Sequence, residues 1–140
     1  MGEFKLSVSG TDINKAVDCV INQKFVKKDV TLAPFGTKAV DSEYDLSEIV
    51  PNDSHAYRLH LKYRCRTNTT KDAYFAMYIS TTTQSINALG CQNQVEGSRQ
   101  QQIGTGFITL GTNDRSLKTL HYSGTNGDYE LVVSGYERLD

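Results

Sequence analysis

The segment that decides the fold is AYRLHLKYRCRT, residues 56–67, because it alternates without a break between two chemically opposite faces. One face carries Tyr57, Leu59, Leu61, Tyr63 and Cys65, and the other carries Arg58, His60, Lys62, Arg64 and Arg66. A side-chain period of two is typical of a β-strand and does not fit a helix of 3.6 residues per turn. One apolar and one polar face indicate an antiparallel sheet with one side in water, so the segment favours an all-β domain.

Further runs of this kind follow on both sides. Apolar and aromatic residues alternate or cluster at 24–33, 73–80, 103–110, 117–122 and 129–136, with turn residues between the runs. Residues 81–102 are mostly polar, and they predict one weak strand flanked by exposed loops. The whole pattern predicts a single antiparallel β-sandwich of jelly-roll type over residues 1–140.

Local signals refine this prediction. Pro34-Phe35-Gly36 predicts the end of the strand that starts at residue 24. Residues 73–80 are expected to form a hairpin with 56–67, and Asn126-Gly127 predicts a tight hairpin turn before the last strand. The predicted core consists of Leu59, Leu61, Phe75, Met77, Ile79, Phe107, Leu110, Leu131 and Val133.

Composition and charge argue against several classes of protein. The 15 Lys and Arg residues balance 16 Asp and Glu residues, so no global field attracts nucleic acid or an anionic membrane. No apolar run approaches the ~20 residues that a membrane helix needs, so no membrane insertion is expected. The start, MGEF, lacks the basic and apolar regions of a signal peptide. Residues 11–25 predict either a short helix or a strand, since their apolar spacing fits both.

The sequence contains no catalytic or metal-binding pattern. The three histidines lack the spacing of metal ligands, and there is no GxSxG elbow and no phosphate-binding loop. Cys19, Cys65 and Cys91 are odd in number and far apart, so we expect buried thiols rather than a disulfide framework or a zinc site. We therefore expect a protein that is not an enzyme and needs no cofactor or metal.

Two surfaces are nevertheless candidates for interaction. The basic face of residues 56–67 is suited to phosphates, sulfates or acidic sugars, but pairing with acidic groups of neighbouring strands, at Glu130, Asp45 or Glu48, is the simpler interpretation. Aromatic residues interleaved with these cations are not expected, which argues against single-stranded nucleic acid. Apolar side chains in the outward phase of two other strands indicate either an overlying segment or an oligomer interface, and these are Tyr74, Tyr78, Val132 and Tyr136.

Three segments resemble a known family. Tyr44-Asp45-Leu46-Ser47, Pro51-Asn52-Asp53 and the ending YELVVSGYERL, residues 129–139, are similar to the C-terminal head domains of bacteriophage tail-fibre and tail-needle proteins. The resemblance covers residues 43–140 and departs at Glu137 and in the first forty residues. It implies a jelly-roll, TNF-like head that forms a homotrimer at a tail tip, in the virion or outside the cell. Such a head binds a host cell-surface receptor, either a glycan or a protein.

Loops on a rigid sandwich are where recognition is expected. The longest polar loop contains Asn93, Gln94, Arg99 and Gln101, whose amide and guanidinium groups suit sugar hydroxyls or carboxylates, and Asn68 lies in a second loop. The basic strand face, at Arg64 and Arg66, is the next candidate. Replacing Asn93, Gln94 and Arg99 together by Ala is expected to abolish binding without changing the thermal midpoint. The alternative functions are a free-standing lectin-like module and a purely structural virion protein.

Overall fold

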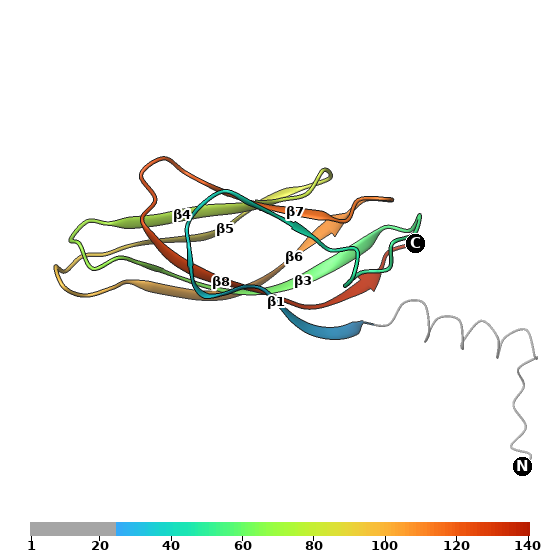
Figure 1. The fold of residues 1–140 in the computed structure, drawn as a ribbon, viewed down its shortest axis with the longest axis horizontal. Coiled ribbons are helices and arrows are strands. Elements are labelled where there is room, and N and C mark those ends of the chain that lie inside the picture. Colours follow the sequence, from blue (N-terminus) through green and yellow to red (C-terminus); the bar gives the residue numbers. More distant parts are fainter. Residues whose placement is uncertain (1–24) are drawn as a thin grey trace, which may run out of the picture.

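The computed structural model describes residues 25–140, which form an all-β sandwich (Figure 1). Its strands are β1 (Val26–Lys38), β2 (Ser42–Asp45), β3 (Tyr57–Thr67), β4 (Tyr74–Ser80), β5 (Ser85–Gln92), β6 (Gln101–Leu110), β7 (Ser116–His121) and β8 (Gly127–Arg138). Within these residues there is no helix, and the helix or strand expected at 11–25 lies almost entirely outside them. The predicted antiparallel β-sandwich is confirmed.

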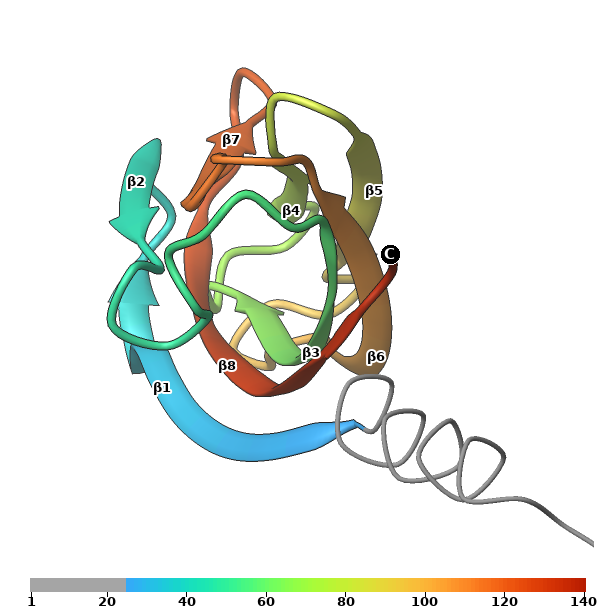
Figure 2. The ribbon, with the colours of Figure 1, turned by 90° about the vertical axis from the view of Figure 1, so that its right-hand side faces the viewer.

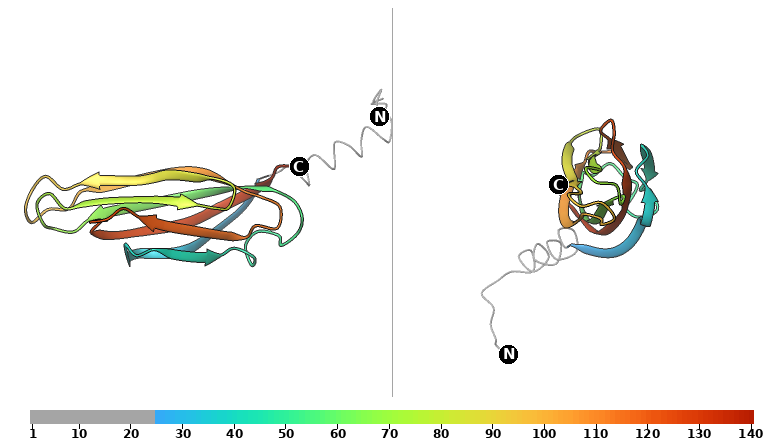
Figure 3. Two further views of the ribbon diagram at one scale, coloured as in Figure 1. Left: turned by 90° about the horizontal axis from the view of Figure 1, so that it is seen from above. Right: turned by 90° about the vertical axis from the view of Figure 1, so that its left-hand side faces the viewer.

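The strands form two four-stranded antiparallel sheets. The β3 sheet has the order β1-β8-β3-β6, and the β4 sheet has the order β2-β7-β4-β5. The pairing is nested: β1 pairs with β8, β2 with β7, β3 with β6, and β4 with β5 at the centre. Figure 2 shows the two sheets facing each other around the interior, and Figure 3 shows the long sandwich with connections at both ends.

This topology corrects two predicted hairpins. The strands β3 and β4 belong to different sheets, so residues 68–73 cross from one sheet to the other. Asn126-Gly127 makes no tight hairpin, because β7 and β8 also lie in different sheets. Gly127 has a φ of +155°, and a Cβ at this position would clash with the backbone of Arg66. Glycine is therefore required here by close backbone approach rather than by a hairpin turn.

The core confirms the alternation of β3 and β4. Eight of the nine predicted core residues are at most 1% exposed, namely Leu59, Leu61, Phe75, Met77, Ile79, Leu110, Leu131 and Val133. Phe107 was wrongly predicted, since its side chain is 57% exposed and its neighbour Ile108 is buried instead. The physical reason is the period of two: Leu110 faces inward, so the residue three positions before it faces outward.

A β-bulge changes the phase of the last strand. Val133 pairs with Leu61 and Gly135 with His60, so β8 carries one extra residue between them. After this bulge Tyr136 lies opposite Leu59 and packs against the core, which overturns its predicted outward phase.

The predicted break at Pro34-Phe35-Gly36 is also wrong, because β1 continues to Lys38. β1 is an edge strand of the β3 sheet, where a proline has no neighbour on one side to which an N–H would donate. The register with β8 shifts between Ala33 and Thr37, and Gly36 has a φ of +102°. The Pro-Gly signal therefore marks an irregularity within an edge strand rather than its end.

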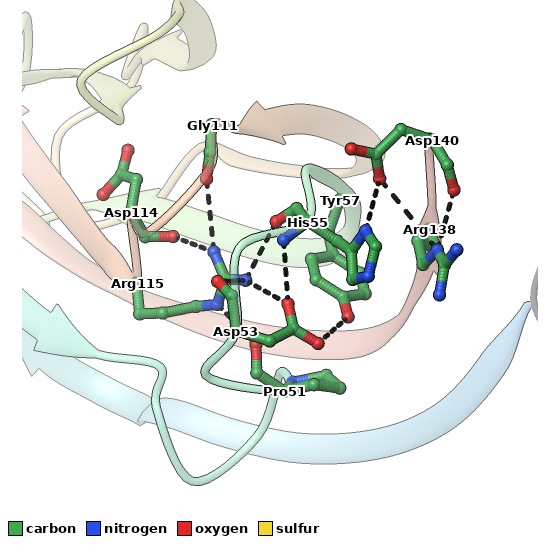
Figure 4. A network of polar contacts seen from close by, with 9 residues as sticks. All are labelled: Pro51, Asp53, His55, Tyr57, Gly111, Asp114, Arg115, Arg138 and Asp140. Carbon is green, nitrogen blue, oxygen red and sulfur yellow. Dashed lines mark hydrogen bonds and ion pairs between the residues drawn. The ribbon is translucent and has the colours of Figure 1, made fainter.

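The connections at one end of the sandwich meet around Arg115, whose side chain is 4% exposed (Figure 4). Its guanidinium donates to five backbone carbonyl oxygens, those of Pro51, Asp53, His55, Gly111 and Asp114, at 2.6–3.2 Å. It also forms an ion pair with the Asp53 carboxylate at 3.2 Å and lies 4.9 Å from the centre of the Tyr57 ring. This one side chain therefore joins the β2–β3 connection to the β6–β7 connection.

Asp53 is the acidic partner in this cluster. Desolvation works to raise its pKa, but hydrogen bonds from the His55 N–H and the Tyr57 hydroxyl, and the charge of Arg115, hold the pKa below its usual range. Burial and the hydrogen bond to Asp53 raise the pKa of Tyr57 to about 12. The cluster is thus an ionised carboxylate held by a phenol and a guanidinium.

Replacing Arg115 by Met is expected to lower the free energy of unfolding by about 3 kcal/mol, since the carbonyl groups lose their donor in a buried place. For a chain of this length the thermal midpoint should fall by roughly 10 °C. The control is Arg138→Met, because Arg138 bonds Asp140 at the exposed C-terminus. Thermal unfolding followed by circular dichroism measures both, and equal midpoints for the two variants would contradict this role of Arg115.

Candidate functional site

A groove lies on the outward side of the β3 sheet. Its volume is about 470 Å³, and it is lined by Lys62, Tyr63, Arg64, Ile103, Gly104, Thr105, Glu130 and Val132. These residues come from β3, β6 and β8, which are neighbours in one sheet. The groove therefore rests on strands rather than on loops, so its lining is held in fixed positions.

The cations of β3 next to this groove are paired with acidic groups. Their ion pairs are Arg58 with Glu137 at 3.2 Å, Lys62 with Asp29 at 3.4 Å, Arg64 with Glu130 at 3.6 Å and Arg66 with Asp128 at 2.7 Å. The ring of His60 forms a hydrogen bond with Glu137 at 3.1 Å. The hydrogen bond from His60 and the nearby Arg58 hold the pKa of Glu137 below its usual range. The expected pairing with Glu130 is confirmed.

The other two acidic partners that the sequence suggested are wrong. Asp45 lies on β2 in the opposite sheet and accepts hydrogen bonds from Ser47. Glu48 lies in the connection after β2 and has no ion pair with β3. Pairing depends on which strands are neighbours, and the true neighbours β8 and β1 supply the carboxylates.

Aromatic rings lie among these cations, contrary to the sequence-based expectation. Phe25 and Phe107 flank His60, with ring centres 4.8 Å and 5.5 Å from it. At the other end of the face, the Phe35 ring lies 3.6 Å from the guanidinium carbon of Arg64. The rings come from β6, from β1 and from the residue before β1, so the period of β3 alone could not reveal them.

In the first part of the edge strand β6, bulky apolar side chains face outward and glycines face inward, which is the reverse of the usual pattern. Ile103 and Phe107 point outward and are 70% and 57% exposed. On the inward side are Gly104 and Gly106, where the ring of Tyr63 occupies the space and would lie 2.7 Å from a Cβ at Gly104. Sequence reasoning missed both residues, because it assigned Phe107 to the core and gave Ile103 no role. The alternation of glycines with bulky apolar residues is the signal that could have found them.

Asn93, the first predicted loop residue, is structural. Its side chain is buried, with 2% exposure, and its amide donates to the carbonyl oxygens of Thr70, Val95 and Ser98 at 2.8–3.0 Å. Its backbone carbonyl also accepts from the N–H of Asp72 at 2.9 Å. Asn93 therefore joins the β3–β4 and β5–β6 connections and has no donor left for a ligand.

The other predicted loop residues do not gather into one site. Arg99 forms an ion pair at 3.4 Å with Asp128, which also holds Arg66. Gln94 and Gln101 are exposed on a shallow groove between β5 and β6. The side chain of Asn68 accepts a hydrogen bond from the backbone of its own loop. The structure thus brings Arg99 and Arg66 together at Asp128 and places Gln94 and Gln101 on one shallow groove.

The four predicted interface residues lie on different faces. Tyr74 and Tyr78 are on β4, and the ring of Tyr78 lies 5.6 Å from that of Tyr122, which follows β7. Val132 lies in the groove of the β3 sheet, on the other side of the sandwich. Tyr136 packs 5.5 Å from Tyr57 against the core. These residues therefore do not form one continuous surface.

Within residues 25–140, no three His, Cys, Asp or Glu side chains lie together as they would to hold a metal ion. In the same part of the chain, no helix has the length and apolar character to cross a membrane.

Replacing Asn93 by Ala is expected to lower the free energy of unfolding by about 2 kcal/mol, since three carbonyl groups lose the buried amide that donates to them. The matched control is Gln94→Ala, whose side chain is exposed and whose loss should change stability by less than about 0.5 kcal/mol. Urea denaturation compares the two variants. Equal stability would contradict the structural role of Asn93 and restore the expectation of an unchanged thermal midpoint.

Comparison with known proteins adds no family to this description. No family model matches the chain, and no curated protein matches it. The function is therefore argued from the surfaces themselves.

Proposed function

We propose that this protein is a binding head without enzymatic activity, of the kind found at the tip of phage tail fibres or similar trimeric adhesins. In this role it recognises a glycan or a protein on a cell surface. The observation that carries the proposal is the groove on the β3 sheet beside the exposed Ile103 and Phe107. Exposed apolar side chains grouped over a groove mark interaction sites. The nested strand pairing supports the jelly-roll type that the sequence suggests, in which eight strands form two sheets.

The chemistry of the groove suits an amphipathic target. Ile103 and Val132 offer apolar contact, while Arg64 and Glu130 offer a donor and an acceptor between them. Since these side chains are held on strands and by ion pairs, little conformational entropy is lost when a target binds. The groove therefore replaces the loop around Asn93 as the proposed contact surface, and it includes Arg64, the second candidate from the sequence.

Replacing Ile103 by Asp is expected to weaken target binding at least about 10-fold, because the variant removes an apolar contact and adds a charge that binding must desolvate. The thermal midpoint should change little, since the side chain is exposed. The matched control is Val95→Asp, an apolar residue with 58% exposure in the β5–β6 loop. Binding is measured on an array of bacterial surface glycans and on whole bacterial cells. Equal binding by both variants would move the contact surface elsewhere.

The homotrimer is part of the same proposal. Aromatic side chains on the outward side of the β4 sheet are the exposed Tyr74 and the half-buried Tyr78. Together with the exposed Tyr122 in the β7–β8 connection, they provide a surface for contacts between copies. This surface lies on the opposite sheet from the groove, so assembly leaves the groove open to a target.

Light scattering at micromolar concentration is expected to give three times the 15.6 kDa mass of one chain. The Tyr78→Asp variant should shift the protein toward monomer, because the added charge would be buried in the contact. Val132→Asp is the control on the opposite sheet. A wild-type monomer would remove the trimer, and glycan binding by that monomer would favour the alternative of a free-standing carbohydrate-binding module.

The alternative module has a specific feature in its favour. A shallow groove of about 430 Å³ between β5 and β6 is lined by five glutamines, Gln92, Gln94, Gln100, Gln101 and Gln102. Planar amides suit sugar hydroxyls. The double variant Gln94→Ala and Gln101→Ala tests this groove. Loss of glycan binding in the double variant, with binding kept in Ile103→Asp, would assign recognition to the glutamine-lined groove.

A further inference from the structure

Two free cysteines meet between the sheets. Cys65 is buried on β3, Cys91 is half-buried on β5, and their Sγ atoms are 3.7 Å apart. The two strands belong to opposite sheets, so no backbone ladder joins them. We propose that this pair is an oxidation site, at which a low-molecular-weight disulfide such as oxidised glutathione converts the two thiols into a disulfide between the sheets. The proposal is independent of the proposed binding function.

The exchange proceeds in two balanced steps. The Cys91 thiolate attacks one sulfur of oxidised glutathione, a mixed disulfide forms, and the first glutathione leaves as its thiolate. The Cys65 thiolate then attacks the Sγ of Cys91 and releases the second glutathione. Two protein thiols are oxidised, one glutathione disulfide is reduced to two thiols, and the protons of the cysteines end on the glutathione sulfurs.

The order of attack follows from exposure. Cys91 lines the shallow groove between β5 and β6, where a small disulfide can reach it, whereas Cys65 is 0% exposed. The hydrogen bond between the two thiols lowers the pKa of Cys91, and that same bond together with burial raises the pKa of Cys65. Cys91 is therefore the nucleophile, as expected of the more accessible thiol with the lower pKa.

The second step is favoured once the first has occurred. The largest causes that raise the pKa of Cys65 include the hydrogen bond to Cys91 and the charge on that sulfur. In the mixed disulfide Cys91 carries no charge, so these contributions disappear and Cys65 ionises more readily. Cys65 is then the resolving thiol.

The movement needed is small. A disulfide requires an S–S distance of about 2.0 Å, so the sulfurs must approach by less than about 2 Å. β5 is an edge strand that pairs only with β4, so one side of it is free to adjust. The new bond would lie two residues before Asn93 and two before Thr67, and it would therefore fasten the end of the sandwich that Asn93 holds.

The test uses the full chain with Cys19→Ser, which removes the third cysteine. After incubation with oxidised glutathione at pH 8, the intact mass should fall by two hydrogen atoms, and both thiols should become unreactive toward a thiol reagent. The thermal midpoint should rise by about 5–10 °C and return on reduction with dithiothreitol.

Two further variants in this background fix the order of the steps. Cys65→Ser should accumulate a mixed disulfide with one glutathione at Cys91, because no resolving thiol remains. Cys91→Ser should react much more slowly, because its one remaining thiol is buried. Two reactive thiols in the folded protein after oxidation, a disulfide-linked dimer, or faster modification of Cys65 than of Cys91 would each overturn the proposal.

Discussion

The constraint on which the rest of the structure depends is that nested pairing sends almost every connection across the sandwich. Of the seven connections between the described strands, the β4–β5 hairpin alone stays within one sheet. A crossing segment leaves the ladder, so its N–H and C=O groups need other partners. Arg115 at one end and Asn93 at the other meet this need, since each is a buried side chain that donates to several carbonyl groups.

The same constraint gives a structural role to residues in two of the three segments on which the suggested resemblance rests. Leu46 is fully buried, Asp45 accepts hydrogen bonds from Ser47, and Asp53 holds Arg115. Each of these residues secures the β2–β3 connection or the core beneath it. These contacts hold the fold together and say nothing about a target. Function therefore has to be argued from side chains that the fold does not require.

Local periodicity predicted what depends on the strand alone. Leu59 and Phe75 were placed correctly because inward and outward positions alternate within one strand. The errors arose where a distant part of the chain determines the position or partner of a side chain. The bulge that turns Tyr136 inward depends on the register of β8 with β3. The acidic partners of Arg58 and Lys62 come from β8 and β1. Asn93 lies in a polar stretch of the sequence and was therefore expected to be exposed. It is buried because the β3–β4 and β5–β6 connections meet around its side chain in the folded chain.

In the strand β6, the alternation within the strand and the contacts with a neighbouring strand together determine the pattern of side chains. Its inward positions Gly104 and Gly106 are empty of side chains because the Tyr63 ring fills that space. The core therefore gives no reason for Ile103 and Phe107, which stand outward on an edge strand. Soluble proteins usually protect such edges with charged residues or cover them. Since the β3 cations nearby are already paired with carboxylates, the apolar side chains of β6 are the part of this face on which the proposed binding function rests.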